Sequence, residues 1–248
     1  MREFEFLING FKVFDADPYV NEWVNSARRV VETLDVSLRR HGRTWFVGVD
    51  ALPNNTEGSI RGATLGGAWM DDLSAHPEFD GWHKAQVSIV YDGYPRQDPD
   101  ESDAAHRFRV KRDAAHMDGL LPEGANRRRH LREPHAFIVG LPLNDVLSSP
   151  LVVWPDSHLV MGRAFSKVFE GVEPRSWGDQ DVTDVYQTAR REVFETCKRV
   201  EVSMRPGQVV LLHRHLIHGV APWEGPDVIE GRQVAYFRPM VANVADWL

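Results

Sequence analysis

The chain has 248 residues, of which 42% are hydrophobic and 26% charged, and this composition is typical of a globular protein rather than a disordered chain. Its formal net charge of −7 argues against a general nucleic-acid-binding function, because binding to a phosphate backbone needs a positive surface. The single cysteine, Cys197, excludes an intramolecular disulfide, and no apolar stretch approaches the ~18 residues of a membrane span, so we expect a cytoplasmic protein without a membrane partner.

Two segments have the apolar spacing of amphipathic helices. In residues 18–41, apolar side chains recur every three or four positions, and Gly42 follows as a helix stop signal. A shorter helix is predicted at 183–197.

The remaining sequence predicts short strands bounded by Gly, Pro, Asp or Asn. The predicted strands are AQVSIVYDGY (85–94), HRFRVKRDAAHMD (106–118), HAFIVGLPLND (135–145), SPLVVWPDSH (149–158), KRVEVSMRPGQVVLLH (198–213) and RQVAYFRPMV (232–241). Many short strands separated by loops favour a sandwich or a barrel.

No linker divides the chain convincingly, so we expect one domain over residues 1–248. Its helical part is predicted at about 18–42 and its strand-rich core at about 85–241, with the polar segment 92–105 as a solvated loop.

The sequence AHMDG places a histidine and a carboxylate, His116 and Asp118, two positions apart. Residues two apart on a strand point to the same face, so this pair supplies two neighbouring ligands for a divalent metal. Such a pair is common by chance, and the alternative is a hydrogen-bonded pair on an exposed strand.

A third ligand is expected from PGQVVLLHRHLIHGVAPW (206–223), which contains His213, His215 and His218. His218 ends the apolar run, and the glycine after it allows the backbone to approach another element closely. We therefore favour His218 as the ligand and expect the other two to be polar residues at a strand end. Two histidines and one carboxylate on one face of a metal are typical of nonhaem Fe(II) oxygenases, whereas zinc prefers a closed tetrahedral site.

Arg232 begins the last predicted strand, fourteen residues after His218. An arginine can hold a carboxylate through two parallel hydrogen bonds. The alternation of side chains puts Arg238 on the same face, so it is a rival for this role, and the further alternative is that both are surface residues.

Together these segments resemble the phytanoyl-CoA dioxygenase-like family of Fe(II)/2-oxoglutarate-dependent oxygenases. Four stretches carry the resemblance in the expected order: AHMDG (115–119), SPLVVWPDSH (149–158), PGQVVLLHRHLIHG (206–219) and GRQVAYFRP (231–239). The second stretch departs from the family's pattern, since Ser149 and Asp156 replace glycines. The resemblance covers roughly residues 106–241.

The resemblance implies a mainly β fold with flanking helices, a double-stranded β-helix (jelly roll) like that of the cupins. It implies that His116, Asp118 and His218 bind Fe(II) and that Arg232 binds the distal carboxylate of the co-substrate 2-oxoglutarate. The implied reaction uses O2, converts 2-oxoglutarate to succinate and CO2, and oxidises a small-molecule substrate. The family's halogenating members have a small residue in place of the carboxylate, so Asp118 favours hydroxylation or another oxidation.

The segment 120–135 contains a basic cluster, which predicts either an anion-binding loop over the pocket or a solvated charged loop paired with Glu123 or Glu133. Its members are Arg127, Arg128, Arg129 and Arg132.

Trp154 is expected near the pocket, and Gln86 and Tyr91 lie on a strand that is a candidate for lining it.

Two other functions fit a β-barrel of this kind. One is a cupin-type metalloenzyme without a co-substrate, which would be expected to supply more histidine ligands. The other is a non-catalytic jelly-roll binding protein, which would be expected to lack a ligand or the anchoring arginine. The fold alone does not separate these possibilities, because function depends on the site.

Overall fold

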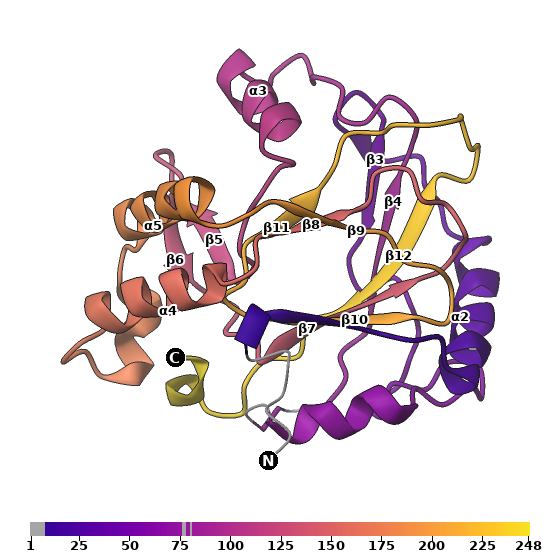
Figure 1. Ribbon diagram of the computed structural model, residues 1–248, viewed down its shortest axis with the longest axis horizontal. Helices are drawn as coiled ribbons and strands as arrows, with labels where there is room; N and C mark the ends of the chain where they lie inside the picture. The colour runs from indigo at the N-terminus through magenta and orange to yellow at the C-terminus, as the bar shows by residue number, and fades with distance from the viewer. Residues whose placement is uncertain (1–7, 76–77, 80) are drawn as a thin grey trace.

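The structure is a computed structural model that describes residues 8–75, 78–79 and 81–248. Two antiparallel sheets face each other (Figure 1), one with the strand order β1-β10-β7-β12-β4-β3-β2 and one with the order β11-β8-β9. The large sheet contains β1 (Phe11–Phe14), β2 (Arg39–Arg40), β3 (Trp45–Gly48), β4 (Gln86–Val90), β7 (Phe137–Pro142), β10 (Val209–His213) and β12 (Arg232–Phe237). The small sheet contains β8 (Leu151–Val153), β9 (Val200–Val202) and β11 (His218–Val220), and a separate hairpin contains β5 (Leu120–Glu123) and β6 (Arg128–Leu131).

From β4 onward the chain crosses between the two sheets in the order of a jelly roll. It passes from β4 in the large sheet to His116, which bridges to β11, and then returns to β7. It continues through β8 and β9 in the small sheet, β10 in the large, β11 in the small and β12 in the large. The predicted double-stranded β-helix is confirmed, with its second strand reduced to the single bridge at His116.

The helix α2 (Pro18–Val31) packs on the outer face of the large sheet. Asp17 caps it by accepting a hydrogen bond from the Tyr19 N–H (2.8 Å), and Pro18 suits the first helical position. The ring of Trp23 lies 5.5 Å from the ring of Phe237 at the end of β12, which ties the helix to the barrel.

The prediction of a helix over 18–41 is correct for its first part and wrong beyond Val31. After the helix ends, the Thr33 hydroxyl donates to the Val30 carbonyl (2.7 Å) and the Asp35 carboxylate accepts from the Ser37 N–H (3.0 Å). Such local side-chain bonds compete with the helical pattern, and the chain turns into the short strand β2.

The predicted strand over 106–118 is wrong for most of its length. Ser102 caps a helix instead, α3 (Asp103–Lys111), by accepting a hydrogen bond from the Ala105 N–H (3.3 Å). The alternation of Phe108 and Val110 with charged residues imitates a strand, but this helix is solvated and buries none of its residues. Only His116 has the expected β pairing.

The helix predicted at 183–197 is confirmed as α5 (Thr183–Thr196). Two of the predicted strands each contain more than one element. The segment 149–158 is a strand only over β8, and an unpredicted helix, α4 (Ser157–Val168), follows it. The segment 198–213 divides into β9 and β10 at a turn where Gly207 has a φ of 93°. Three short 3-10 helices complete the described elements: η1 (Ala68–Ala75), η2 (Pro174–Asp179) and η3 (Val244–Trp247).

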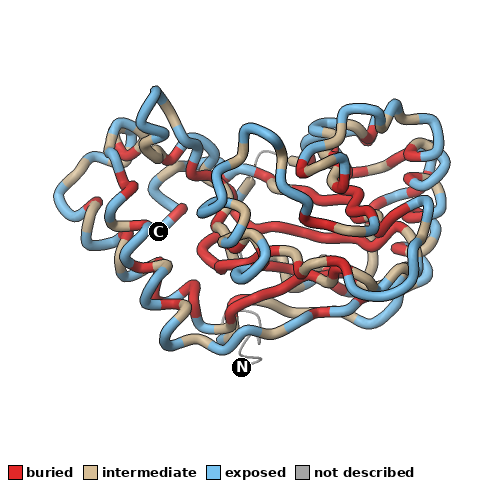
Figure 2. Tube along the Cα trace, turned by 90° about the horizontal axis from the view of Figure 1, so that it is seen from above, coloured by how far each residue is buried: buried red, intermediate tan, exposed pale blue. Residues whose placement is uncertain are grey.

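The strands of the barrel form the buried centre of the molecule (Figure 2). One apolar cluster fills the space between the sheets and draws Leu151 and Val153 from the small sheet and Val234 and Tyr236 from the large one. A larger cluster packs α2, α4 and α5 against the outer faces. No described helix is long and apolar enough to cross a lipid bilayer.

We expect Trp23→Ala to lower the free energy of unfolding by about 3–5 kcal/mol, because the indole is fully buried and donates a hydrogen bond to the Gly58 carbonyl (2.8 Å). Tyr19→Ala on the same helix is the control, since Tyr19 is 64% exposed and its loss should cost under about 0.5 kcal/mol. Urea unfolding of both variants checks this, and equal losses would show that α2 is not anchored through Trp23.

Candidate metal centre and its pocket

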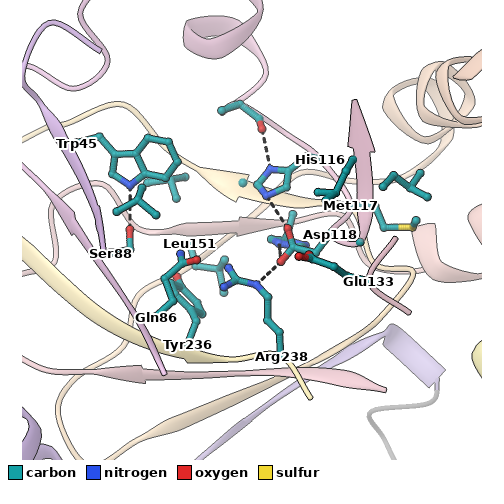
Figure 3. Close-up of a pocket in the computed structure, with 18 of the residues that line it drawn as sticks. Trp45, Gln86, Ser88, His116, Met117, Asp118, Glu133, Leu151, Tyr236 and Arg238 are labelled. Carbon is teal, nitrogen blue, oxygen red and sulfur yellow. Dashed lines mark hydrogen bonds and ion pairs between the residues drawn. The ribbon is translucent and has the colours of Figure 1, made fainter. Parts of the chain in front are cut away.

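The three predicted metal ligands converge, with one ligand atom from each lying within 4.8 Å of the others. Nε2 of His116 lies 3.1 Å from the Asp118 carboxylate, and Nε2 of His218 lies 3.8 Å from it. His116 and Asp118 lie on the segment between α3 and β5, and His218 is the first residue of β11 (Figure 3 shows the first two).

A backbone bridge holds these segments together. The His116 N–H donates to the His218 carbonyl (2.8 Å), and the His218 N–H donates to the His116 carbonyl (3.0 Å). The approach requires the glycine after each ligand segment: a Cβ on Gly219 would lie 2.1 Å from the Asp113 carbonyl oxygen, and a Cβ on Gly119 would lie 2.3 Å from that of Glu133. The close approach expected after His218 is therefore found.

Hydrogen bonds to main-chain carbonyls fix the orientation of both imidazoles. Nδ1 of His116 donates to the Ala114 carbonyl (2.9 Å), and Nδ1 of His218 donates to the Leu216 carbonyl (3.0 Å). With the proton on Nδ1, the lone pair of each Nε2 is free to bind a metal. This is the usual support of a ligating histidine, and it involves no other side chain.

Arg238, just after β12, donates a hydrogen bond from Nε to the Asp118 carboxylate (2.5 Å). Burial by itself raises the pKa of Asp118, but the guanidinium of Arg238 outweighs it, and the pKa lies well below its usual range. Burial also lowers the pKa of His218 to about 4. The carboxylate is thus ionised and the buried imidazole neutral, which are the protonation states that metal ligands need.

The three ligands open onto a pocket of about 460 Å³. Its wall includes Trp45 and Ser88 of the large sheet, which are joined by a hydrogen bond from the indole Nε1 to the hydroxyl (2.9 Å), as Figure 3 shows. The other lining residues are mostly apolar, with a few polar and charged groups among them. The polar and charged ones besides the ligands are Gln86, Tyr94, Arg109, Arg129, Glu133, Tyr236 and Arg238.

The two candidate anchoring arginines lie at opposite ends of β12. Arg238 lines the pocket beside Asp118, whereas Arg232 is only 6% exposed and opens the strand. Five residues lie between them, and the six steps of extended chain span about 20 Å, so the two guanidinium groups have different surroundings. In the described part of the chain, no hydrogen-bond or ion-pair partner is found for the Arg232 guanidinium.

Several other expectations are settled by the structure. Gln86 lines the pocket, whereas Tyr91 lies in the core with Arg39 stacked on its ring. Trp154 lies beside the pocket but does not line it: its N–H donates to the carbonyl of Ile217 (3.1 Å), the residue before His218, and its ring is buried against Phe194, 5.5 Å between ring centroids.

His213 and His215 lie outside the metal cluster, as expected. His213 ends β10 with its ring 5.0 Å from that of His158, and the ring of His215 lies 4.4 Å from Trp247. Both histidines therefore belong to an aromatic cluster away from the pocket.

The basic cluster divides into paired and unpaired members. Arg128 pairs with Asp181 and Asp184, and Arg132 pairs with Glu123, as the solvated-loop interpretation expects. Arg129 instead lines the pocket. Trp45, Tyr94 and Arg109 also line the pocket, although the sequence does not predict it, because they lie outside the motif-bearing segments and no spacing connects them to the candidate ligands.

Comparisons with known proteins identify the fold. No protein-family model matches this chain, and no curated protein matches its sequence. The structure is similar to the non-heme alpha-ketoglutarate-dependent epimerase SnoN from nogalamycin biosynthesis, with a TM-score of 0.52 and 17% identity over 96% of this chain and 80% of that one. It is also similar to the non-heme alpha-ketoglutarate-dependent carbocyclase SnoK from the same biosynthesis, with a TM-score of 0.51 and 16% identity over 96% and 81%. These likenesses, at low identity, establish the shared double-stranded β-helix fold.

We expect His116→Ala or Asp118→Ala to weaken Co(II) binding on the order of 100-fold or more, because each removes one of the three candidate ligands. Visible absorption during Co(II) titration measures the affinity. His213→Gln is the matched control from the other histidine cluster and should bind as the unmodified protein does; a loss of binding in this variant instead would place the metal elsewhere.

Proposed function

We propose that this protein is an Fe(II)- and 2-oxoglutarate-dependent oxygenase that hydroxylates a small organic substrate. The observation that carries the proposal is the convergence of two Nε2 atoms and a carboxylate at the end of a barrel pocket. Two histidines and one carboxylate leave the remaining positions of a six-coordinate metal open. The two similar structures named above belong to alpha-ketoglutarate-dependent enzymes, which supports the same class.

The donor set fits Fe(II). Both imidazoles keep their Nδ1 protons on main-chain carbonyls and offer Nε2, and Asp118 is ionised. His116, Asp118 and His218 would hold the metal, and when bound it would supply the redox chemistry that couples O2 reduction and 2-oxoglutarate decarboxylation to substrate oxidation. The protein side chains orient the reactants and exclude water from them.

The barrel also suits 2-oxoglutarate. Arg232 projects from the same face of β12 as Tyr236, which lines the pocket, and it is buried without a carboxylate partner in the described chain. A buried guanidinium is costly unless an anion compensates it. We assign Arg232 to the distal carboxylate of 2-oxoglutarate, while Arg238 balances the charge of Asp118 at the metal end.

We expect Fe(II)-dependent succinate formation from 2-oxoglutarate and O2, slowly even without the prime substrate. Asp118→Ala should abolish it, because the variant cannot hold the metal. Succinate is measured by chromatography in anaerobically reconstituted protein. Persistent absence of succinate in protein shown to contain Fe(II) would contradict the proposal, and metal-dependent turnover of another substrate without 2-oxoglutarate would favour a cupin-type enzyme.

We expect Arg232→Gln to raise the 2-oxoglutarate concentration needed for half-saturation roughly 10- to 100-fold, the effect of losing a hydrogen-bonded charge pair. The visible charge-transfer band of the anaerobic Fe(II) protein reports binding during titration. Arg238→Gln is the paired variant: a larger shift in this variant than in Arg232→Gln would mean that Arg238 is the anchor.

A further inference from the structure

Side chains alternate between the two faces of the β5–β6 hairpin, so its arginines point to different sides. Arg128 is held outside by Asp181 and Asp184, and Arg132, beyond the end of β6, is held by Glu123. Arg129 points to the other face of the hairpin, where it lines the pocket of the metal centre. One arginine of the cluster is therefore directed at the site where a substrate would bind.

Backbone and neutral groups make the contacts of Arg129, and no carboxylate of the described residues pairs with its guanidinium. Its N–H donates to the Thr183 hydroxyl (2.6 Å), and its carbonyl accepts from the Val182 N–H (3.0 Å), so the start of α5 holds its backbone. Its Nη1 donates to the Leu120 carbonyl (2.8 Å), and the guanidinium lies 5.2 Å from the ring centroid of Tyr186. These contacts orient the side chain and leave donors of its planar fork available.

A second guanidinium adds to the positive charge on this side. Arg190 lies 5.0 Å from the same Tyr186 ring and donates to the Ala115 carbonyl (3.3 Å), beside the ligand His116. Within the described residues, neither Arg129 nor Arg190 has a carboxylate at ion-pair distance. Two like charges on one buried ring repel each other, and a bound anion would offset this cost.

The other two arginines of the pocket wall have a carboxylate at ion-pair distance. Arg238 pairs with Asp118, and Arg109 pairs with Glu101 (2.6 Å). Arg129 is the lining arginine left with an unmatched charge in the described chain. Next to it, Leu120, Leu121 and Pro122 give the wall an apolar character.

We propose that the substrate is a small organic carboxylate with an apolar body, and that Arg129 binds its carboxylate. This inference rests on the proposed function, since it names the substrate class of the same site. A planar fork matches a carboxylate through two parallel hydrogen bonds, and the apolar wall beside it suits the rest of the molecule.

The test compares phenylacetate with phenylacetamide, which have nearly the same shape but differ in charge. Binding is measured by titration calorimetry to protein loaded with Ni(II) and 2-oxoglutarate, so that the co-substrate occupies its own anchor and no turnover occurs. We expect phenylacetate to bind roughly 10- to 100-fold more tightly than the amide, and Arg129→Gln to remove most of this preference. Arg132→Gln, a change on the same hairpin, should keep it.

Equal binding of the two compounds to the unmodified protein would overturn the proposal, whatever the variants do. Retention of the preference in Arg129→Gln would overturn it as well. Arg129→Lys keeps the charge without the fork and should retain part of the preference, and thermal melting of each variant shows whether it is folded.

A repeat of the titration without Ni(II) and 2-oxoglutarate, in the Arg232→Gln background, separates this inference from the proposed function. If the Arg129-dependent preference remains while the Fe(II) protein forms no succinate, the carboxylate site stands and the co-substrate chemistry is wrong. If succinate forms but the preference is absent from the loaded protein, the oxygenase stands and the substrate class is wrong.

Discussion

The pair of main-chain hydrogen bonds between His116 and His218 is the contact on which the rest of the site depends. It joins a segment that has almost no other β structure to the first residue of β11, and it brings candidate ligands 102 positions apart in the chain to one place. Side-chain packing alone does not set such a distance, because imidazoles have several rotamers. Here the bridge fixes the Cα positions of both histidines, and the Ala114 and Leu216 carbonyls fix the orientation of their rings. Main-chain groups therefore position the two Nε2 atoms.

The charges of the pocket are arranged along β12 and the β5–β6 hairpin. Arg238 meets the ligand carboxylate at one end of β12, and Arg232 is buried at the other. Because a strand keeps residues of one parity on one face, a single element provides a cation beside the Asp118 carboxylate and a second, buried cation at its other end. Arg232 and Arg238, the two candidates for binding 2-oxoglutarate, thus have separate environments. The end of β12 at which the distal carboxylate of 2-oxoglutarate binds determines which of them is the anchor.

The sequence predicted the parts of this structure that local patterns control. The alternation and the turn residues around 137–142 and 232–237 identified the central strands, and the spacing of apolar residues identified α2 and α5. It failed where a pattern was ambiguous: Phe108 and Val110 alternate as in a strand, but the cap at Ser102 and the surrounding solvent favour a helix. Trp45 and Arg109 were beyond reach for another reason, since only the pairing of β3 with β4 and the path of α3 bring them to the pocket.

The hairpin that carries Arg129 also determines where a bound substrate would lie relative to the metal. Asp118 is followed by Gly119, and Leu120, whose carbonyl accepts from Arg129, comes next. The carboxylate of Asp118 and the carbonyl that Arg129 binds are therefore two residues apart in the chain, and the Glu133 carbonyl packs against this stretch at Gly119. An anion held by Arg129 would keep a fixed offset from the metal centre whatever its apolar body does. A fixed offset selects which carbon of the substrate faces the metal, and such orientation is the main contribution that a protein makes when the cofactor supplies the reactivity.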